Sequence, residues 1–155
     1  MIGRLLRSTD FERVLRTRTR ASSTHFALHH LLGLPSLPHK PMGQAEILAS
    51  SSELSTGNAP RMLEPVDDLP SGAQRGVWLG TVVPKRHARR AVTRTLLKRQ
   101  IRLAVSARAG ALLGGLWVVR LRAPFDKVMF PSAASVALRT SARRELDLLL
   151  SSAAR

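Results

Sequence analysis

The sequence has no cysteine and no tyrosine, and it has only two tryptophans and four phenylalanines among 155 residues. Without cysteine the chain forms no disulfide and offers no thiolate to a metal, and it is compatible with a reducing cytoplasm. No apolar run approaches the roughly 20 residues of a membrane-spanning helix. Because basic helices that lie on lipid usually carry an aromatic apolar face, the few aromatic residues also make a membrane surface a weaker candidate partner.

Acidic residues are missing from a long stretch, since none occurs between Leu69 and Asp126. The whole chain has 25 Lys and Arg against 10 Asp and Glu, a formal net charge of +15. Uncompensated positive charge is costly in a folded protein and is usually balanced by a bound polyanion. Arg dominates the basic residues, and it can hold a phosphate with two hydrogen bonds and stack on a base. The composition therefore favours nucleic acid as the partner.

Hydrophobic spacing predicts several regular elements outside the middle of the chain. In order, these are a helix within Arg4–Arg20, a strand at His25–Leu32, a strand at Val77–Val83, a helix from about Ala88 or Val92 to Ala107, a strand at Leu116–Arg122 and a helix at Ser135–Ser152. This order predicts the α+β class, with one central sheet and helices packed on it. The pairing of the strands does not follow from the pattern.

The segment 33–75 differs from its surroundings. It contains most of the prolines, many Ser and Gly, and five of the ten acidic residues. No hydrophobic period persists in it, so we expect a long, flexible insertion within a single domain that spans residues 1–155. Its acids could fold back on the basic surface, although a solvated linker is the simpler interpretation.

The strongest feature of the chain is the stretch Pro84–Arg102, where eight Lys or Arg fall within 19 residues. Residues four apart share a helix face, which predicts a cationic row of Arg90, Arg94, Lys98 and Arg102. The residues expected on the opposite side, packed on the sheet, are Val92, Leu96 and Leu103. The other cations of the stretch are Lys85, Arg86 and Arg89 in the preceding turn, and Arg99. A merely solvated face is the alternative, but such faces usually mix both signs of charge.

This cationic pattern resembles the signature of the bacterial ribonuclease P protein subunit. The resemblance rests on the motif Lys85-Arg86-x-x-Arg89-Arg90-Ala91-x-x-Arg94-x-x-x-Lys98-Arg99-x-x-Arg102. Upstream, the pattern Leu6 then Asp10-Phe11-x-x-Val14 and a strand with Phe26 follow in the family's order. Two positions depart from the family's Arg-Asn-Arg core, because Thr95 replaces the Asn and Leu96 replaces the second Arg.

The resemblance implies a small α/β sandwich like domain two of a ribosomal protein of the small subunit, with a left-handed crossover into the basic helix. It implies an RNA-binding subunit of the endonuclease that removes the 5′ leader from precursor tRNA. In that family the RNA subunit performs the cleavage with Mg²⁺, so the protein is expected to have no catalytic residue, metal site or cofactor of its own and to work in the cytoplasm.

The partners that the resemblance implies are the catalytic RNA, held by the eight cations of the motif, and the leader of precursor tRNA. The leader would lie in a cleft between the first helix and the sheet. By position, Phe11 and Phe26 are candidates for that cleft. Packing in the core is the alternative for both phenylalanines.

Other constellations in the sequence are weak. His25, His29 and His30 lie close together, but no carboxylate or Cys is near them in sequence to complete a metal site. No Ser-His-Asp set, paired carboxylates or Gly-rich phosphate loop stands out, so a hydrolytic site on the protein is not expected. Two alternative functions remain open, a structural RNA-binding protein of ribosomal type and a module for double-stranded DNA. Against the second, no helix-turn-helix pair surrounds the basic helix.

Overall fold

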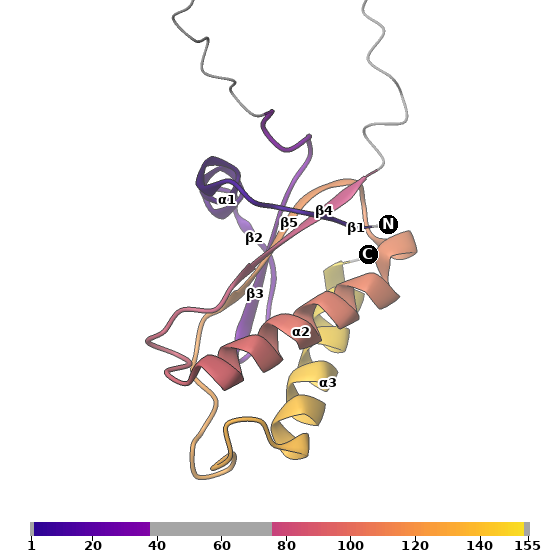
Figure 1. Cartoon of the computed structure of the whole chain (residues 1–155). Coiled ribbons are helices and arrows are strands. Elements are labelled where there is room, and N and C mark those ends of the chain that lie inside the picture. The colour runs from indigo at the N-terminus through magenta and orange to yellow at the C-terminus, as the bar shows by residue number, and fades with distance from the viewer. Residues whose placement is uncertain (1, 38–75, 154–155) are drawn as a thin grey trace, which may run out of the picture.

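The computed structural model describes residues 2–37 and 76–153. Its strands are β1 (Ile2–Arg4), β2 (Thr19–Ser22), β3 (Phe26–Leu31), β4 (Val77–Val82) and β5 (Gly115–Leu121). Its α-helices are α1 (Ser8–Leu15), α2 (Ala91–Ala107) and α3 (Val136–Ala153), and a short 3₁₀ turn, Ala109–Ala111, follows α2. The predicted α+β class is confirmed, with one sheet and helices packed on it (Figure 1).

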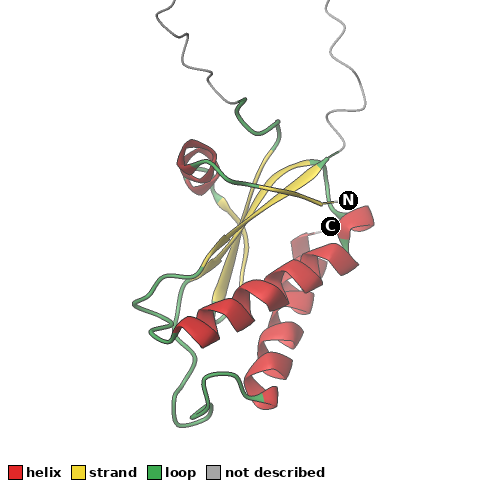
Figure 2. Cartoon of the chain, in the orientation of Figure 1, coloured by secondary structure: helices red, strands yellow, loops and turns green. Residues whose placement is uncertain are grey.

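The sheet is mixed and has the strand order β1-β4-β5-β3-β2. Strands β1, β4 and β5 run parallel to one another, whereas β3 is antiparallel to β5 and β2 is antiparallel to β3. The parallel neighbours β4 and β5 are joined through α2, which is therefore the helix of a crossover connection. Helix α1 lies on one face of the sheet, and α2 and α3 lie together on the other face (Figures 1 and 2).

The central strand β5 separates two apolar clusters, because successive side chains of a strand point to opposite faces. Trp117, Val119 and Leu121 belong to the larger cluster beneath α2 and α3. Leu116 and Val118 belong to the smaller cluster beneath α1. All five are at most 1% exposed. Strand β5 is thus apolar without interruption from Leu116 to Val119, as expected for a strand covered on both faces.

The first part of the chain contains two strands that the sequence did not predict. The segment predicted as one helix within Arg4–Arg20 divides into the end of β1, helix α1 and the start of β2. Strand β1 has only three residues, and β2 is an edge strand with the polar sequence Thr-Arg-Ala-Ser. Neither strand shows the apolar alternation that makes a strand recognisable, because neither has an apolar face of its own.

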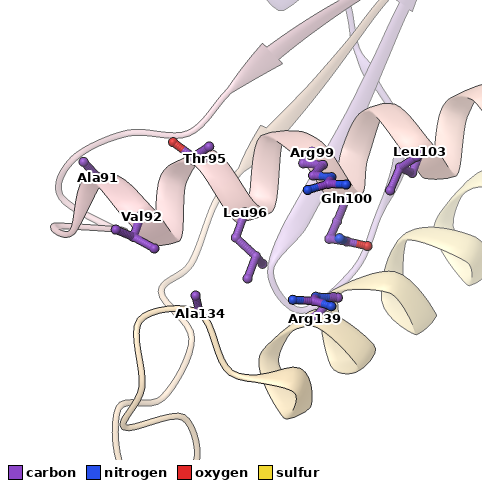
Figure 3. Close-up of a pocket in the computed structure, with 9 residues that line it drawn as sticks. All are labelled: Ala91, Val92, Thr95, Leu96, Arg99, Gln100, Leu103, Ala134 and Arg139. Atoms are coloured by element: carbon purple, nitrogen blue, oxygen red, sulfur yellow. The ribbon is translucent and has the colours of Figure 1, made fainter.

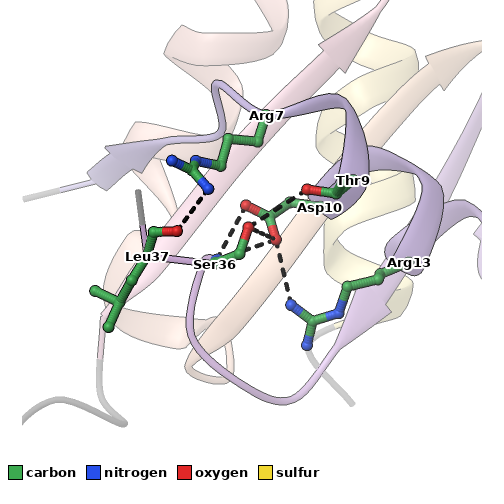
Figure 4. A network of polar contacts seen from close by, with 6 residues as sticks. All are labelled: Arg7, Thr9, Asp10, Arg13, Ser36 and Leu37. Atoms are coloured by element: carbon green, nitrogen blue, oxygen red, sulfur yellow. Dashed lines mark hydrogen bonds and ion pairs between the residues drawn. The ribbon is translucent and has the colours of Figure 1, made fainter. Parts of the chain in front are cut away.

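The beginning of the predicted insertion is attached to α1 by polar contacts (Figure 4). The carboxylate of Asp10 accepts hydrogen bonds from the backbone N–H of Ser36, at 3.1 Å, and from its hydroxyl, at 2.9 Å. Arg7 donates a hydrogen bond to the carbonyl of Leu37. Ser36 and Leu37 are therefore held against the helix and the residue before it. The remainder of the predicted insertion, residues 38–75, lies outside the described residues.

Candidate nucleic-acid interface

The basic segment begins in a turn between β4 and α2. Pro84 ends the strand, and its carbonyl accepts hydrogen bonds from the backbone N–H groups of His87 and Ala88, both at 3.1 Å. Ala88 is buried, while the cations around it are exposed. The turn therefore has one apolar anchor, and the exposed side chains of Lys85, Arg86, Arg89 and Arg90 extend from it.

Arg94 fixes this turn onto the first part of α2. Its guanidinium donates hydrogen bonds to the carbonyls of Ala88, at 3.0 Å, and Arg89, at 2.7 Å. The side chain is accordingly half-buried rather than extended into solvent. Arg94 thus has a structural role in addition to its charge, which the spacing of the motif alone did not indicate.

The cations of the motif lack acidic partners in the described part of the chain. Every ion pair there involves other basic residues, namely Arg13, His25, Arg108 and Arg143. The first turn of α2 contains no acid either. Cations near the N-terminus of a helix are unfavourable, because the helix dipole is positive at that end. A bound phosphate would relieve both the repulsion between the cations and the interaction with the dipole.

The orientation of α2 corrects one prediction. Leu96 is buried as expected, but Val92 is 57% exposed and Leu103 is 46% exposed, so neither packs on the sheet. The buried face of α2 carries instead Leu97, Ile101, Ala104 and Val105. The error arose because apolar residues lie on two sides of this helix, and the spacing of Val92, Leu96 and Leu103 is as regular as that of the residues that are buried.

The predicted cationic row winds around α2 and does not stay on one face of the helix. Successive steps of four residues advance by roughly 40° around a helix of 3.6 residues per turn. Arg94 lies beside the buried face, Lys98 is half-buried, and Arg99 and Arg102 are exposed. The eight predicted cations therefore form a curved surface that runs from the turn 84–90 to the middle of α2.

A hollow of about 500 Å³ lies beside the basic turn. Its cationic lining comprises Arg86, Arg89, Arg90 and Lys127, and its apolar lining includes Phe125 and Phe130. The hydroxyl of Thr93 donates a 2.8 Å hydrogen bond to the carbonyl of Ala133, which holds the 124–134 loop against the start of α2. Lys127 was not predicted as part of the site, because it lies 25 residues beyond the motif and directly follows Asp126.

A second candidate surface is the face of the sheet that carries α1. Phe11 is half-buried and lies against Gly80 of β4, where a Cβ would come within 2.5 Å of the phenyl ring. Alternation along β5 places Arg120 on this same face, paired in register with Ala27 and Val82. Arg120 is half-buried and has no described acidic partner. The position of Phe11 is compatible with the predicted leader surface, and Arg120 is a cation of this surface that the motif did not predict.

Phe26 does not lie on this surface. It is fully buried in the larger cluster, on the opposite face of the sheet, where its ring contacts Phe125 edge to face at 6.0 Å between centroids. The prediction that Phe26 lines a cleft beneath α1 is therefore wrong, and the alternative of core packing holds. Successive side chains of a strand point to opposite faces of the sheet. The residues of β3 that face α1 are therefore Ala27 and His29, the neighbours of the residues that face α2 and α3.

The three neighbouring histidines bond to other groups. His25 Nδ1 lies 2.7 Å from the carboxylate of Glu145, which is 120 residues away in sequence. His29, which is buried, and His30 contact backbone carbonyls through ring nitrogens, at 3.2 and 3.1 Å. Within residues 2–37 and 76–153 no three His, Asp or Glu residues are grouped as a metal ion would require.

The sequence model of the ribonuclease P family matches residues 3–143, which is most of the chain. This chain belongs to the ribonuclease P protein family. The resemblance seen in the basic motif is thereby confirmed. Among the described residues, no helix is both long enough and apolar enough to cross a membrane.

The similar proteins are described as ribonuclease P protein components. A ribonuclease P protein component from Paraburkholderia xenovorans is 32% identical over 153 residues, which cover 99% of this chain and 81% of the relative. One from Burkholderia pseudomallei is 44% identical over 81 residues, or 52% of this chain. That second match spans 60% of the relative, which is less than two thirds of its length.

The fold has a counterpart among solved structures. The RNase P protein of Staphylococcus aureus matches with a TM-score of 0.52, covering 97% of this chain and 94% of that chain. The sequence identity is only 16%, so the likeness concerns the fold alone. It agrees with the small α/β sandwich that the resemblance implied.

Proposed function

We propose that this chain is the protein subunit of ribonuclease P, and that it binds the RNA subunit through the curved cationic surface of the turn 84–90 and α2. The observation that carries the proposal is the set of eight cations without a described acidic partner in a member of this family. Phosphates of a folded RNA would supply the missing negative charge. Arg also suits this role because its planar fork can bind two phosphate oxygens.

We further propose that the α1 face of the sheet holds the 5′ leader of precursor tRNA. Phe11 offers a partly exposed ring for stacking with an unpaired base, and Arg120 offers a cation for its phosphate. Both are half-buried, so their positions are fixed before the leader binds. Because Phe11 is in α1 and Arg120 is in β5, a single-stranded RNA leader that lies along the helix and the sheet would contact both.

In this proposal the protein positions the two RNAs and the RNA subunit cleaves the phosphodiester bond with Mg²⁺. The binding surfaces described above consist of cations together with apolar and aromatic side chains, which are suited to holding RNA. Cations along the protein would reduce the repulsion between the two RNAs, a task that is otherwise left to Mg²⁺. The proposal therefore predicts that the protein matters most at low Mg²⁺, and it places the chain in the cytoplasm, where tRNA is processed.

The test is reconstitution with the RNA subunit from the same organism and a precursor tRNA. The protein should accelerate release of the 5′ leader at low Mg²⁺, and the effect should shrink as Mg²⁺ is raised. If about 5 phosphates are neutralised, the logarithm of the affinity for the RNA should fall with the logarithm of salt concentration with a slope on the order of 4. A slope near zero would contradict the electrostatic basis of the proposal.

A structural RNA-binding protein of ribosomal type remains the second candidate, since the cationic surface would suit ribosomal RNA as well. The reconstitution separates the two functions. A ribosomal protein would bind structured RNA with the same dependence on salt, but it would not accelerate cleavage of precursor tRNA. The variant Phe11→Ala, with Glu12→Ala as the neighbouring control, should raise KM for a precursor with a leader while leaving affinity for the RNA subunit unchanged.

A further inference from the structure

A groove of about 600 Å³ opens between α2 and α3, next to the cationic surface (Figure 3). Its apolar lining includes Val92, Leu96 and Leu103 of α2, two of which are the exposed residues that fail to pack on the sheet. Leu96 stands where the family signature has an Arg, so in this chain the motif contributes an apolar wall at that point. Small molecules and nucleotides commonly bind in hollows of this size.

The groove also contains a buried amide. Gln100 is only 6% exposed, and Figure 3 shows its side chain pointing from α2 toward Arg139 of α3. Among the described residues, no hydrogen bond joins this amide to another protein group. Every fully enclosed polar side-chain atom there does have a partner, so the atoms of this amide are not fully enclosed and reach the open space of the groove. The donor and acceptor groups of this amide are therefore available to a ligand or to water in the groove.

The charge of the groove is positive. Arg99 and Arg139 line it from the two helices, and no acidic residue is among the nine residues that line it. Arg99 is also one of the cations assigned above to the RNA-binding surface. A polyanion bound along α2 would therefore pass the mouth of the groove.

We propose that this groove binds an unpaired nucleotide of the RNA partner, an inference that rests on the proposed function. The base lies on the apolar wall, its hydrogen-bonding edge meets the amide of Gln100, and Arg99 and Arg139 hold the phosphate or stack on the base. An amide supplies both a donor and an acceptor, as the edge of a base requires, whereas a phosphate alone would use only donors. Arg99 and Arg139 have no acidic partner among the described residues, which favours a nucleic acid over an apolar peptide, because the peptide would leave both charges without a partner.

The first test maps the occupant. Because the sequence has no cysteine, Leu103→Cys provides a single attachment site for an aryl azide at the groove. Leu148→Cys is the matched control, since Leu148 is 74% exposed on α3 and does not line the groove. In complex with the RNA subunit, the probe at position 103 should crosslink to a discrete unpaired nucleotide, and the probe at 148 should not. Crosslinks from position 103 only to this protein or to a second copy of it would overturn the proposal.

The second test asks whether Gln100 reads the base. Gln100→Leu keeps the apolar volume and removes the amide, and it should weaken binding of the RNA subunit roughly tenfold, the order expected for a lost bidentate contact to a base. Changing the crosslinked base should weaken binding to the unmodified protein by a similar factor. The same base change should have little further effect on binding to the Gln100→Leu variant. Independent, multiplicative effects would overturn the assignment of Gln100.

Controls keep the outcomes distinct. Thermal unfolding shows whether Gln100→Leu remains folded, and if it does not, Arg139→Gln replaces it. Arg144→Gln, which changes another exposed arginine of α3, is the matched control. A loss with Arg139→Gln and not with Arg144→Gln supports the groove, while equal affinities contradict it. If the unmodified protein itself fails to bind the RNA subunit, the proposed function fails. If it binds normally and both groove variants do too, only the groove assignment fails.

Discussion

The carboxylate of Asp10 accepts hydrogen bonds from both the backbone N–H and the hydroxyl of Ser36, 26 residues further along the chain. Asp10 is 1% exposed, and its cationic partner Arg13 lies one helical turn away, at 3.2 Å. The contact joins α1 to the segment that leaves β3. It therefore holds the helix that carries Phe11 in place over the sheet.

Removing this carboxylate should destabilise the protein. Asp10→Ala leaves the N–H of Ser36 without its partner, and we expect a loss of about 1–3 kcal/mol in the free energy of unfolding. Glu12→Ala, which removes an exposed carboxylate from the same helix, serves as the control and should change stability little. Urea denaturation of the two variants measures the difference. Equal stabilities would mean that the Asp10–Ser36 contact contributes nothing.

Arg94 and Arg102 should behave differently although both belong to the motif. Arg94→Ala removes two hydrogen bonds to the turn, so it should lower stability by roughly 1–2 kcal/mol as well as weaken RNA binding. Arg102 is exposed, so Arg102→Ala should weaken RNA binding and reduce its salt dependence without changing stability. Thermal unfolding and RNA titrations at several salt concentrations test the pair. If Arg94→Ala melts like the unmodified protein, its role in the turn is wrong.

The orientation of α2 can be tested with two leucines. Leu97 is fully buried in the larger apolar cluster, and Leu97→Ala should cost roughly 2–5 kcal/mol of stability. Leu103 is 46% exposed, so Leu103→Ala should cost much less. Chemical denaturation of both variants decides the matter. A larger loss for Leu103→Ala than for Leu97→Ala would show that the helix faces the other way.

Glu145 ties α3 to the start of β3. Burial alone would raise the pKa of its carboxyl, but hydrogen bonds from Ser23 and His25 outweigh burial and lower the pKa below the ordinary glutamate value. A carboxyl with a lowered pKa in the folded state stabilises the protein at pH values above the unfolded pKa. That contribution disappears as the pH falls through the lower folded value.

Stability should therefore decline on acidification below about pH 5, partly through this carboxyl. Glu145→Gln should reduce stability at neutral pH and flatten the decline in the acidic range. Some decline should remain as the pH falls below about 6.5, the ordinary histidine value, because burial lowers the pKa of His30 and protonating that ring opposes folding. Unfolding free energies of both proteins at a series of pH values provide the measurement. Parallel curves would exclude a contribution from Glu145.

How far the sequence predicted the fold depended on how apolar each element is. Strands β3, β4 and β5 and helices α2 and α3 are long and apolar enough to be recognised, and their bounds were predicted to within three residues or fewer. Strands β1 and β2 are short and polar, so only their neighbours make them strands. The insertion at 33–75 was predicted from composition and stays a prediction, because residues 38–75 lie outside the described residues. Near its start, Ser36 is attached to α1 by Asp10.

The sequence by itself predicted nucleic acid as the class of partner, because the clustered cations and the missing acids are properties of the chain and not of its folding. It also determined the family through the spacing of those cations. Only the tertiary structure decided which residues share a surface. It buried Phe26, placed Arg120 on the same face of the sheet as Phe11, and left Leu103 beside Gln100 in a groove. The physical reason is that some elements are apolar on more than one side. Such a helix, or a strand whose two faces are both apolar, has no preferred face until its neighbours pack against it.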